Sequence, residues 1–397
     1  MTVTPAVSPH YVRGIKNILG YWQTQTQQVR DDDLPGLNRV HANLLRFVQH
    51  GLVVNETLPF AAQLMLQLLP FIERGGHWDT WLPMYERALT EGRALSPQTS
   101  HQLWLQRGTL YRFRGDLTQA VQAHRRARTL ARRLDDRLAV AQADFQLAED
   151  YRILRQLDRA TVRCTVVLQS LGAHDQARPV QASVYNTLGI IAMEEGRYEE
   201  ARDWYVSAVA LWHTLGEPTQ QARCLRNLAI LARQQAAYDQ ALVHYQEALA
   251  LLQDTSNHID RCRVYLSLGS LYDAWGMPDK AEENLRAAEA LSRQGEIDYQ
   301  LRGNILHNLG NIALKAGRLA EAEVALRRAQ TVWRQTGERL YLANSVGVLG
   351  ETLAAQGQLA AADDCYQEAL TLLQAFPDSP LAQRWTAYFQ AQRAGLG

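Results

Sequence analysis

Residues 186–211 read NTLGIIAMEEGRYEEARDWYVSAVAL, and the same arrangement of small, turn-forming and bulky residues returns along the chain. Copies of it begin at residues 227, 267, 308 and 348, where the chain reads NLAILARQQAAYDQALVHYQEALALL, SLGSLYDAWGMPDKAEENLRAAEAL, NLGNIALKAGRLAEAEVALRRAQ and VLGETLAAQGQLAAADDCYQEALTLL. Self-similarity at a fixed period is typical of architectures in which each unit packs only on its neighbours. The 397 residues are therefore divided by this repeat rather than by ordinary domain lengths.

Two small residues mark every unit, and successive units are about 40 residues apart. The first of them stands at Gly108, Ala148, Gly189, Ala229, Gly269, Gly310 and Gly350. The second stands at Ala120, Ala160, Ala201, Ala241, Ala281, Ala322 and Ala362. Small residues let two helices approach closely, and we expect the large residue four positions after the second one, such as Tyr205, to fill the space beside them.

A glycine separates the two small residues in most units. It is Gly115, Gly196, Gly276, Gly317 or Gly357. Glycine adopts the left-handed conformation that ends a helix without a steric penalty. Each unit is therefore predicted to be a helical hairpin whose turn lies at this glycine.

These positions resemble the consensus of the tetratricopeptide repeat. One unit carries it at Trp104, Gly108, Gly115, Ala120 and Ala127, and another at Tyr185, Leu188, Gly189, Gly196, Ala201, Tyr205 and Ala208. The resemblance implies an all-α, right-handed superhelical solenoid of about eight helix hairpins with capping helices at both ends. Family units are usually 34 residues long, so these units need either extra helical turns or a longer link, such as the one around Gly216. Long units of this kind resemble the helical sensor arrays of bacterial STAND/NB-ARC-like regulators and of kinesin light chains.

An eighth and more degenerate unit, with Gly76, Tyr85 and Ala88 in the same frame, precedes the seven regular ones. The segment LPGLNRVHANLLRFVQHG before it resembles the region that joins the nucleotide-binding module of those regulators to their helical array. No G-x-x-x-x-G-K-[ST] phosphate loop occurs in the chain. The sequence therefore resembles the sensor half without the NTPase module.

Three regions are expected along the chain. Residues 1–60 form an N-terminal helical cap or linker-like region, residues 61–375 the repeat array, and residues 376–397 a C-terminal capping helix. In this last helix Leu381, Trp385 and Tyr388 recur at helical spacing, which suits a helix that covers the open face of the last unit.

Catalysis and cofactor binding are not expected. The motifs H-E-x-x-H, G-x-S-x-G and G-x-G-x-x-G are absent, and the repeats leave no insertion long enough for an active site. The four cysteines contain no C-x-x-C pair, so burial is favoured over a metal or redox role. His124 and Cys164 take the bulky position of their units and are expected to be packing residues. The sequence thus predicts a protein that is not an enzyme and has no cofactor and no metal site.

Charge and hydropathy indicate where the protein resides. The 41 basic residues balance the 41 acidic ones, so no global field attracts nucleic acid or an anionic membrane. No stretch approaches the roughly 18 consecutive apolar residues of a membrane span. The start MTVTPAVSPH has neither a basic leader nor an apolar run suited to export, and the cysteines form no C-x-x-C pair. We therefore predict a cytoplasmic protein, with no membrane partner.

The resemblance also implies where a partner binds, because the first helices of tetratricopeptide repeats line the concave surface. The inward positions of the central units hold Asn186, Arg226, Asn227, Arg233, His307, Asn308, Asn311 and Lys315, and one turn earlier on their helices lie Arg223 and Arg263. Asparagine side chains can hydrogen-bond the backbone of an extended peptide, and arginines can bind carboxylates. This pattern predicts a protein or peptide partner with an acidic, extended segment. The alternative is that these residues only keep the groove solvated, as surface polar residues commonly do.

The sequence therefore favours a non-catalytic protein-interaction scaffold or sensor that holds a partner polypeptide in its groove. An alternative is a stand-alone regulatory subunit that controls a separately encoded effector, such as an NTPase, a protease or a defence enzyme. Nucleic-acid binding is less favoured because no aromatic residues are interleaved with the arginines of the predicted groove.

Overall fold

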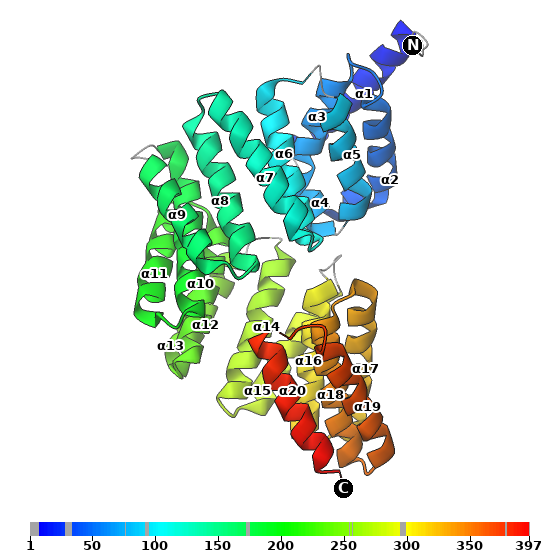
Figure 1. The fold of residues 1–397 in the computed structure, drawn as a ribbon, viewed down its shortest axis with the longest axis vertical. Coiled ribbons are helices and arrows are strands. Elements are labelled where there is room, and N and C mark those ends of the chain that lie inside the picture. The colour runs from blue at the N-terminus through cyan, green and yellow to red at the C-terminus, as the bar shows by residue number, and fades with distance from the viewer. Residues whose placement is uncertain are drawn as a thin grey trace. The chain divides into compact units, whose positions relative to one another are not determined.

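The structure of the protein is a computed structural model. It describes residues 8–27, 34–75, 77–91, 95–171, 175–253, 255, 257–293, 299–377 and 379–396. These residues form twenty α-helices and one short 3-10 helix, and no strand occurs in the described part of the chain (Figure 1). The predicted all-helical fold of packed hairpins is confirmed. The predicted landmark Gly76 lies outside the described residues.

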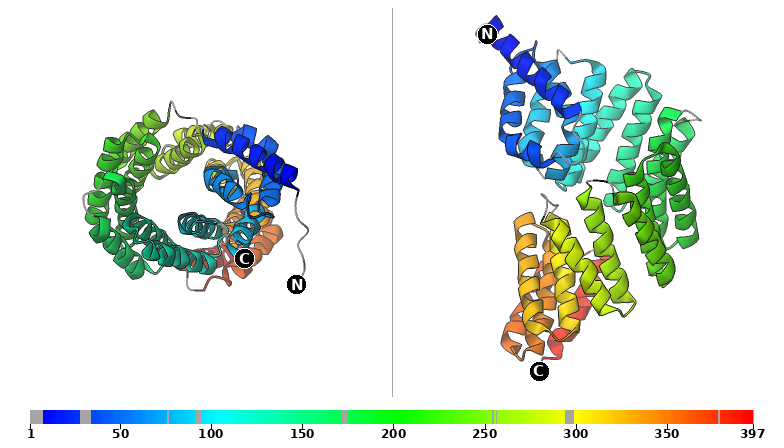
Figure 2. Two further views of the ribbon diagram at one scale, coloured as in Figure 1. Left: turned by 90° about the horizontal axis from the view of Figure 1, so that it is seen from above. Right: turned by 180° about the vertical axis from the view of Figure 1, so that it is seen from behind.

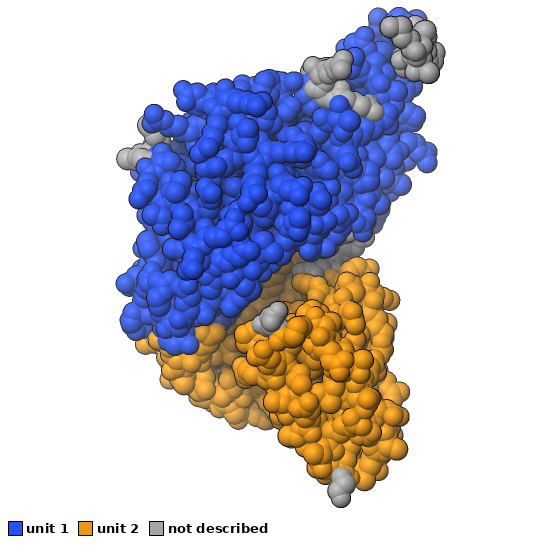
Figure 3. Space-filling model, in the orientation of Figure 1, with its two compact units in different colours: residues 1–231, 254–256 blue, residues 232–253, 257–397 orange. Residues whose placement is uncertain are grey.

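The chain divides into two compact units (Figure 3). Unit 1 holds residues 1–231 and 254–256, and unit 2 holds residues 232–253 and 257–397. The boundary falls inside helix α12 (Pro218–Gln234). Among the described residues no helix is both long enough and apolar enough to span a membrane.

Unit 1 begins with helices that do not follow the repeat and continues with regular hairpins. Its helices are α1 (Pro9–Gln27), α2 (Leu34–Gly51), α3 (Leu58–Gln67), α4 (Leu69–Gly75), α5 (Trp78–Glu91), α6 (Pro97–Phe113), α7 (Leu117–Arg133), α8 (Arg137–Ile153), α9 (Leu157–Leu171), η2 (Asp175–Ala177), α10 (Arg178–Glu194) and α11 (Tyr198–Leu215). Helices α1, α2 and α3 pack on one another. The hairpins pair α6 with α7, α8 with α9 and α10 with α11, each antiparallel (Figure 2).

Unit 2 consists of hairpins followed by one final helix. Its helices are α13 (Tyr238–Leu252), α14 (His258–Ala274), α15 (Pro278–Ser292), α16 (Tyr299–Lys315), α17 (Leu319–Thr336), α18 (Arg339–Ala355), α19 (Leu359–Leu373) and α20 (Pro380–Ala394). The hairpins pair α14 with α15, α16 with α17 and α18 with α19. Helix α20 packs on α18 and α19.

The small residues of the first helices allow the close approach predicted for them. A methyl group added at Gly189 would lie 2.6 Å from the ring of Tyr205, which is fully buried. The same addition at Gly310 would lie 2.6 Å from Leu326 Cγ. Each bulky residue stands four positions after the second small residue of its unit. The prediction that it fills the space beside the small residues is confirmed.

The turns of the hairpins need the left-handed conformation in every regular unit. The five predicted turn glycines have φ between 73° and 84°. Two units have no glycine at this place, and there Arg155 (φ 60°) and Ala236 (φ 58°) adopt the same conformation. This conformation costs a residue with a Cβ roughly 1–2 kcal/mol. The sequence of the turn can therefore depart from glycine, although the backbone conformation does not.

Replacing Ala236 by glycine is expected to stabilise the protein by about 1 kcal/mol, because the left-handed strain at this turn disappears. The measurement is the urea denaturation midpoint. The matched control is Ala236→Ser, which keeps the Cβ and should leave the midpoint nearly unchanged. Equal midpoints for the glycine variant and the parent would contradict the assignment of strain.

In the unit formed by α10 and α11, the extra length lies in the helices and not in the link that follows. Helix α11 has 18 residues and α12 has 17, and only Gly216 and Glu217 separate them. Gly216 adopts φ 69° and ends α11. Of the two explanations that the sequence left open, extra helical turns, rather than a longer link around Gly216, make this unit longer than the usual family unit.

The degenerate unit departs from a two-helix hairpin because of Pro70. Proline has no backbone N–H, so the carbonyl of Leu66 loses the helical donor four residues later. The side chain of Gln106 donates to this carbonyl instead, at 3.0 Å. The first half of the unit is accordingly split into α3 and α4. The hydroxyl of Tyr85 in α5 donates to Gln106 Oε1 at 2.7 Å and joins the two halves.

Candidate functional site

The first helix of each hairpin carries polar side chains that reach the first helix of the neighbouring hairpin. We call this surface the first-helix face. In unit 1 it includes four of the predicted partner-binding residues, Asn186 in α10 and Arg223, Arg226 and Asn227 in α12. The amide of Asn227 donates to Asn186 Oδ1 at 2.8 Å. The structure thus brings Asn186 and Asn227 together, as a pair whose amides bind each other.

Similar bonds join the earlier first helices of unit 1. The guanidinium of Arg112 in α6 donates to Asp150 Oδ1 in α8 at 3.2 Å. The hydroxyl of Thr187 in α10 donates to Glu149 Oε1 in α8 at 2.7 Å. In both pairs the residues are 38 positions apart, which is about one repeat. The polar residues of this face therefore hold neighbouring repeats in register.

In unit 2 the face carries the other six predicted residues. The ammonium of Lys315 in α16 donates to both carboxylate oxygens of Asp273 in α14, at 2.7 Å each. Arg263 lies one turn from Asp260 on the same helix, with 3.4 Å between guanidinium and carboxylate. These two cations are thus balanced by carboxylates of their own unit.

His307 lies at the centre of a hydrogen-bonded group between α16 and α18. Its Nε2 is 3.0 Å from the amide nitrogens of both Asn311 and Asn344, and its Nδ1 is 2.9 Å from Ser345 Oγ. Amide nitrogens only donate, so Nε2 accepts, and the ring proton belongs on Nδ1. Burial lowers the pKa of His307 to about 4. The imidazole is therefore neutral and fixes both asparagine side chains.

This arrangement makes the stability of the protein depend on pH. The unfolded chain takes up the His307 proton near pH 6.5, and the folded chain only near pH 4. The stability from the neutral ring is complete above pH 6.5, and about 3 kcal/mol of it is lost as the pH falls to 4. Urea denaturation between pH 4 and 8 measures this loss.

His307→Gln should flatten this pH dependence, because glutamine does not titrate. The control is His213→Gln, which removes an exposed histidine and should leave the pH dependence as in the parent. If the His307 variant loses as much stability on acidification as the parent, the pH dependence does not come from the burial of a neutral His307.

Two of the predicted residues in unit 2 keep donors that no other described residue uses. The side-chain amide of Asn308 in α16 forms no hydrogen bond with the described residues. Arg233 forms no ion pair with them, and its Nε is buried without a hydrogen-bond partner. Of the six predicted residues of unit 2, these two are the ones whose side chains form no polar bond with the described residues, and the buried Nε of Arg233 is not accessible to a ligand.

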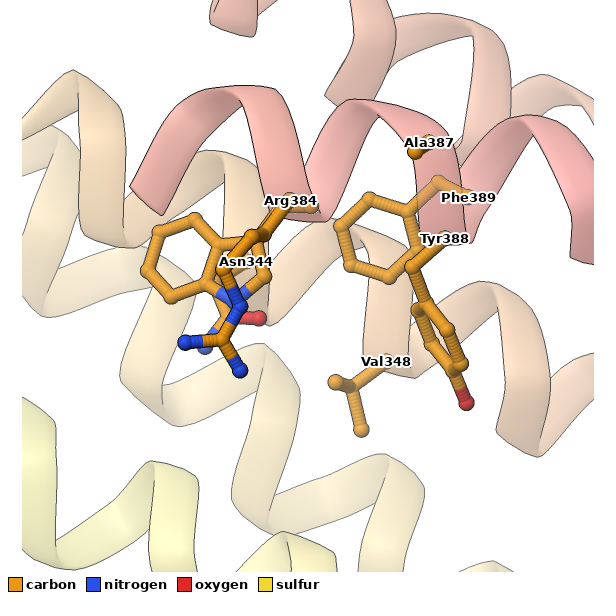
Figure 4. A pocket seen from close by; sticks show the side chains of 7 residues that line it. Asn344, Val348, Arg384, Ala387, Tyr388 and Phe389 are labelled. Carbon is orange, nitrogen blue, oxygen red and sulfur yellow. The ribbon is translucent and has the colours of Figure 1, made fainter. Parts of the chain in front are cut away.

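A pocket of about 500 Å³ lies between α18 and α20, and the sequence did not predict it. It is lined by Asn344, Val348, Arg384, Trp385, Ala387, Tyr388 and Phe389 (Figure 4). The sequence indicated Trp385 and Tyr388 only as residues of a capping helix. Tyr388 is 46% exposed, so this residue of α20 does not serve only to pack the helix on its neighbours. The signal for this pocket in the sequence was Arg384 beside the aromatic residues Trp385 and Tyr388.

The buried cysteines and His124 occupy packing positions. Cys164, Cys224 and Cys262 are buried, and burial raises the pKa of each thiol to about 12. A thiol with such a pKa stays protonated at neutral pH and is a poor nucleophile. A methyl group added at Gly108 would lie 2.3 Å from His124 Nε2, so this ring fills the bulky position of its unit.

A comparison with known protein families identifies the repeat. The tetratricopeptide repeat family model matches residues 180–254, 238–294 and 301–375. A search among curated proteins found no match.

Solved structures with a similar fold cover nearly the whole chain. The signal transduction ATPase with numerous domains (STAND) with a tetratricopeptide repeat sensor from Pyrococcus horikoshii has a TM-score of 0.60 and 14% identity, covering 98% of this chain and 56% of that one. The apo form of the quorum sensor NprR from B. thuringiensis has a TM-score of 0.58 and 14% identity, covering 91% and 99%. Aspartyl phosphate phosphatase F from Bacillus subtilis has a TM-score of 0.57 and 13% identity, covering 96% and 97%.

At such identities these likenesses concern the fold alone. The family match, the spacing of the small residues and the packed hairpins agree with one another. Residues 180–294 and 301–375 of this chain are tetratricopeptide repeats.

Proposed function

We propose that the protein is a non-catalytic interaction scaffold or sensor that binds a partner polypeptide along its first-helix face. The observation that carries the proposal is the contrast within unit 2. Several polar residues of the face are held by intramolecular bonds, whereas the side chains of Asn308 and Arg233 form no polar bond with the described residues. Fixed neighbours beside such unbonded side chains make a preorganised surface, which lowers the entropic cost of binding.

The ten predicted residues take two roles in this proposal. Asn308 and Arg233 contact the partner directly. His307, Asn311 and Lys315 hold the surface in shape through bonds to α18 and α14. Asn186 and Asn227 act as such a bonded pair in unit 1, where Arg223 and Arg226 contribute positive charge.

The chemistry of Asn308 and Arg233 favours an acidic, extended partner segment. An asparagine amide both donates and accepts, so it can bind the main chain of a peptide of any sequence. A guanidinium binds a carboxylate through charge-assisted bonds, which are stronger than neutral ones. Main-chain bonds therefore supply affinity, and Arg233 selects an acidic side chain.

The test is capture of partners from native cells by the parent and by the double variant Asn308→Ala and Arg233→Gln. The matched control is Asn284→Ala with Arg286→Gln, which removes the same two residue types from the second helix α15. Quantitative mass spectrometry should show the main partner reduced about tenfold or more with the first variant and unchanged with the control. Equal capture by both variants, at unchanged melting temperature, would reject this face.

A second candidate is a regulatory subunit that controls a separately encoded effector. The observation that favours it is the likeness to the STAND protein, a signal transduction ATPase with a tetratricopeptide repeat sensor. The same capture experiment separates the candidates, because an NTPase or protease as the main captured protein favours this one.

The non-catalytic part of the proposal has its own test, since one structural relative is named an aspartyl phosphate phosphatase. We expect no release of phosphate from acetyl phosphate or from an aspartyl-phosphorylated response regulator on addition of the purified protein. Turnover that rises in proportion to the protein concentration would contradict the proposal.

A further inference from the structure

The pocket between α18 and α20 combines three kinds of side chain. Arg384 provides a cation, Asn344 an amide, and Val348, Trp385 and Tyr388 an apolar wall. Figure 4 shows the polar groups of Asn344 and Arg384 on one side of the pocket and the side chains of Val348 and Tyr388 on the other. A few polar groups set in an otherwise apolar cavity of several hundred Å³ are typical of ligand sites.

We propose that this pocket binds the C-terminal residue of the partner polypeptide. The terminal carboxylate pairs with Arg384, the backbone N–H of the last residue donates to Asn344 Oδ1, and its apolar side chain lies against Trp385 and Tyr388. This inference rests on the proposed function, and it adds which part of the partner is held at this end of unit 2.

Arg384 supplies the positive charge that binds the terminal carboxylate. Its side chain is exposed and forms no ion pair with the described residues. Other arginines of unit 2 are balanced within the fold, such as Arg318 by Glu282 and Arg393 by Asp363. Arg384 therefore has an uncompensated charge, and its planar fork matches a carboxylate through two parallel hydrogen bonds.

Asn344 is held in place for a ligand. One N–H of its amide is bound to His307 Nε2 at 3.0 Å, which fixes the plane of the side chain. An asparagine amide has two donors and one carbonyl oxygen. The second N–H and Oδ1 thus remain for a ligand, whose orientation they set without further loss of side-chain freedom.

The aromatic wall selects the side chain of the last residue. Phe389 forms the buried part of the wall, with 1% exposure, and Tyr388 is held by a hydrogen bond of its hydroxyl to Glu351 Oε2 at 3.1 Å. The Glu351 carboxylate behind this ring disfavours an acidic side chain next to it. A carboxylate and an apolar side chain belong to one residue only at a C-terminus, whereas an internal Asp or Glu would leave the aromatic wall unfilled.

The experiment uses an array of octapeptides anchored by their N-termini, in which the last residue is varied and each peptide carries either a free carboxylate or a C-terminal amide. The full-length protein is expected to prefer free carboxylates that follow Leu, Ile, Val, Phe or Met. Amidation should weaken binding about tenfold or more, since a charge-assisted pair is lost.

Arg384→Gln should remove the difference between acid and amide, while the control Arg286→Gln on α15 keeps it. Melting temperatures check that both variants are folded. Equal binding of acid and amide, no binding to any peptide, or an unchanged acid preference in the Arg384 variant would overturn the proposal. A native partner whose capture needs Asn308 and Arg233 but not Arg384 would overturn it too, and would leave the proposed function standing.

Discussion

Replacing Trp333 by alanine is expected to lower the free energy of unfolding by about 3–5 kcal/mol, the usual cost of removing a buried indole. Trp333 is 1% exposed, and its ring lies so close to Gly303 that a methyl group there would be 2.5 Å from it. Its Nε1 donates to Ser345 Oγ at 3.1 Å, the same oxygen that His307 contacts. The substitution therefore opens a cavity and weakens the group that fixes the first-helix face of unit 2.

The measurement is urea denaturation, combined with hydrogen exchange in α16, α17 and α18. The control is Tyr341→Ala, which removes the partly exposed ring stacked on Trp333 and should cost much less. A loss below about 1 kcal/mol for Trp333→Ala would show that this indole is not a core residue of the unit.

Replacing Phe389 by alanine should release α20 from the rest of unit 2, at a cost of about 3–5 kcal/mol to its docking. The Phe389 ring fills the space over Gly347, where a methyl group would be 2.1 Å from Cζ. It also lies 6.2 Å from the ring of Tyr366, centroid to centroid. Among the described helices, α20 packs mainly on α18 and α19, so few other contacts replace this one.

Hydrogen exchange of the α20 amides reports this release directly. Protection in α20 should fall by about two to three orders of magnitude or more, with α14 and α15 unchanged. The control is Tyr388→Ala, because that ring is 46% exposed and should affect docking little. Full protection of α20 in the Phe389 variant would contradict the assignment. The octapeptide preference for a free carboxylate should also disappear, since the pocket needs both helices.

The hairpins could be predicted because their determinants are local. Gly189 and Tyr205 belong to one hairpin, and their spacing alone specifies a contact between two antiparallel helices. The left-handed turn was predicted from Gly196 and its equivalents, but Ala236 adopts it too. There the packing of the two helices fixes the turn and overrides the preference of the residue. The split of the degenerate unit followed from Pro70, whose effect the repeat pattern concealed.

The candidate site could be predicted less well, because it depends on which residues of neighbouring helices meet. The sequence placed Asn186 and Asn227 on one face, but their bond to each other requires the offset between α10 and α12. Lys315 similarly pairs with Asp273, which lies one repeat earlier in the chain. The pocket at Arg384 depends on the docking of α20, and no spacing within the repeat encodes that position.

The most direct test of partner binding on the first-helix face is site-specific photo-crosslinking in native cells. A photoreactive phenylalanine analogue is placed at position 304 on α16, one turn before Asn308, or, as control, at position 284 on α15, and the crosslinked proteins are identified by mass spectrometry. We expect one main partner, crosslinked through an acidic, extended segment at position 304 and not at 284. Crosslinks at 284 alone, equal crosslinks at both positions, or none at 304 would contradict partner binding on this face.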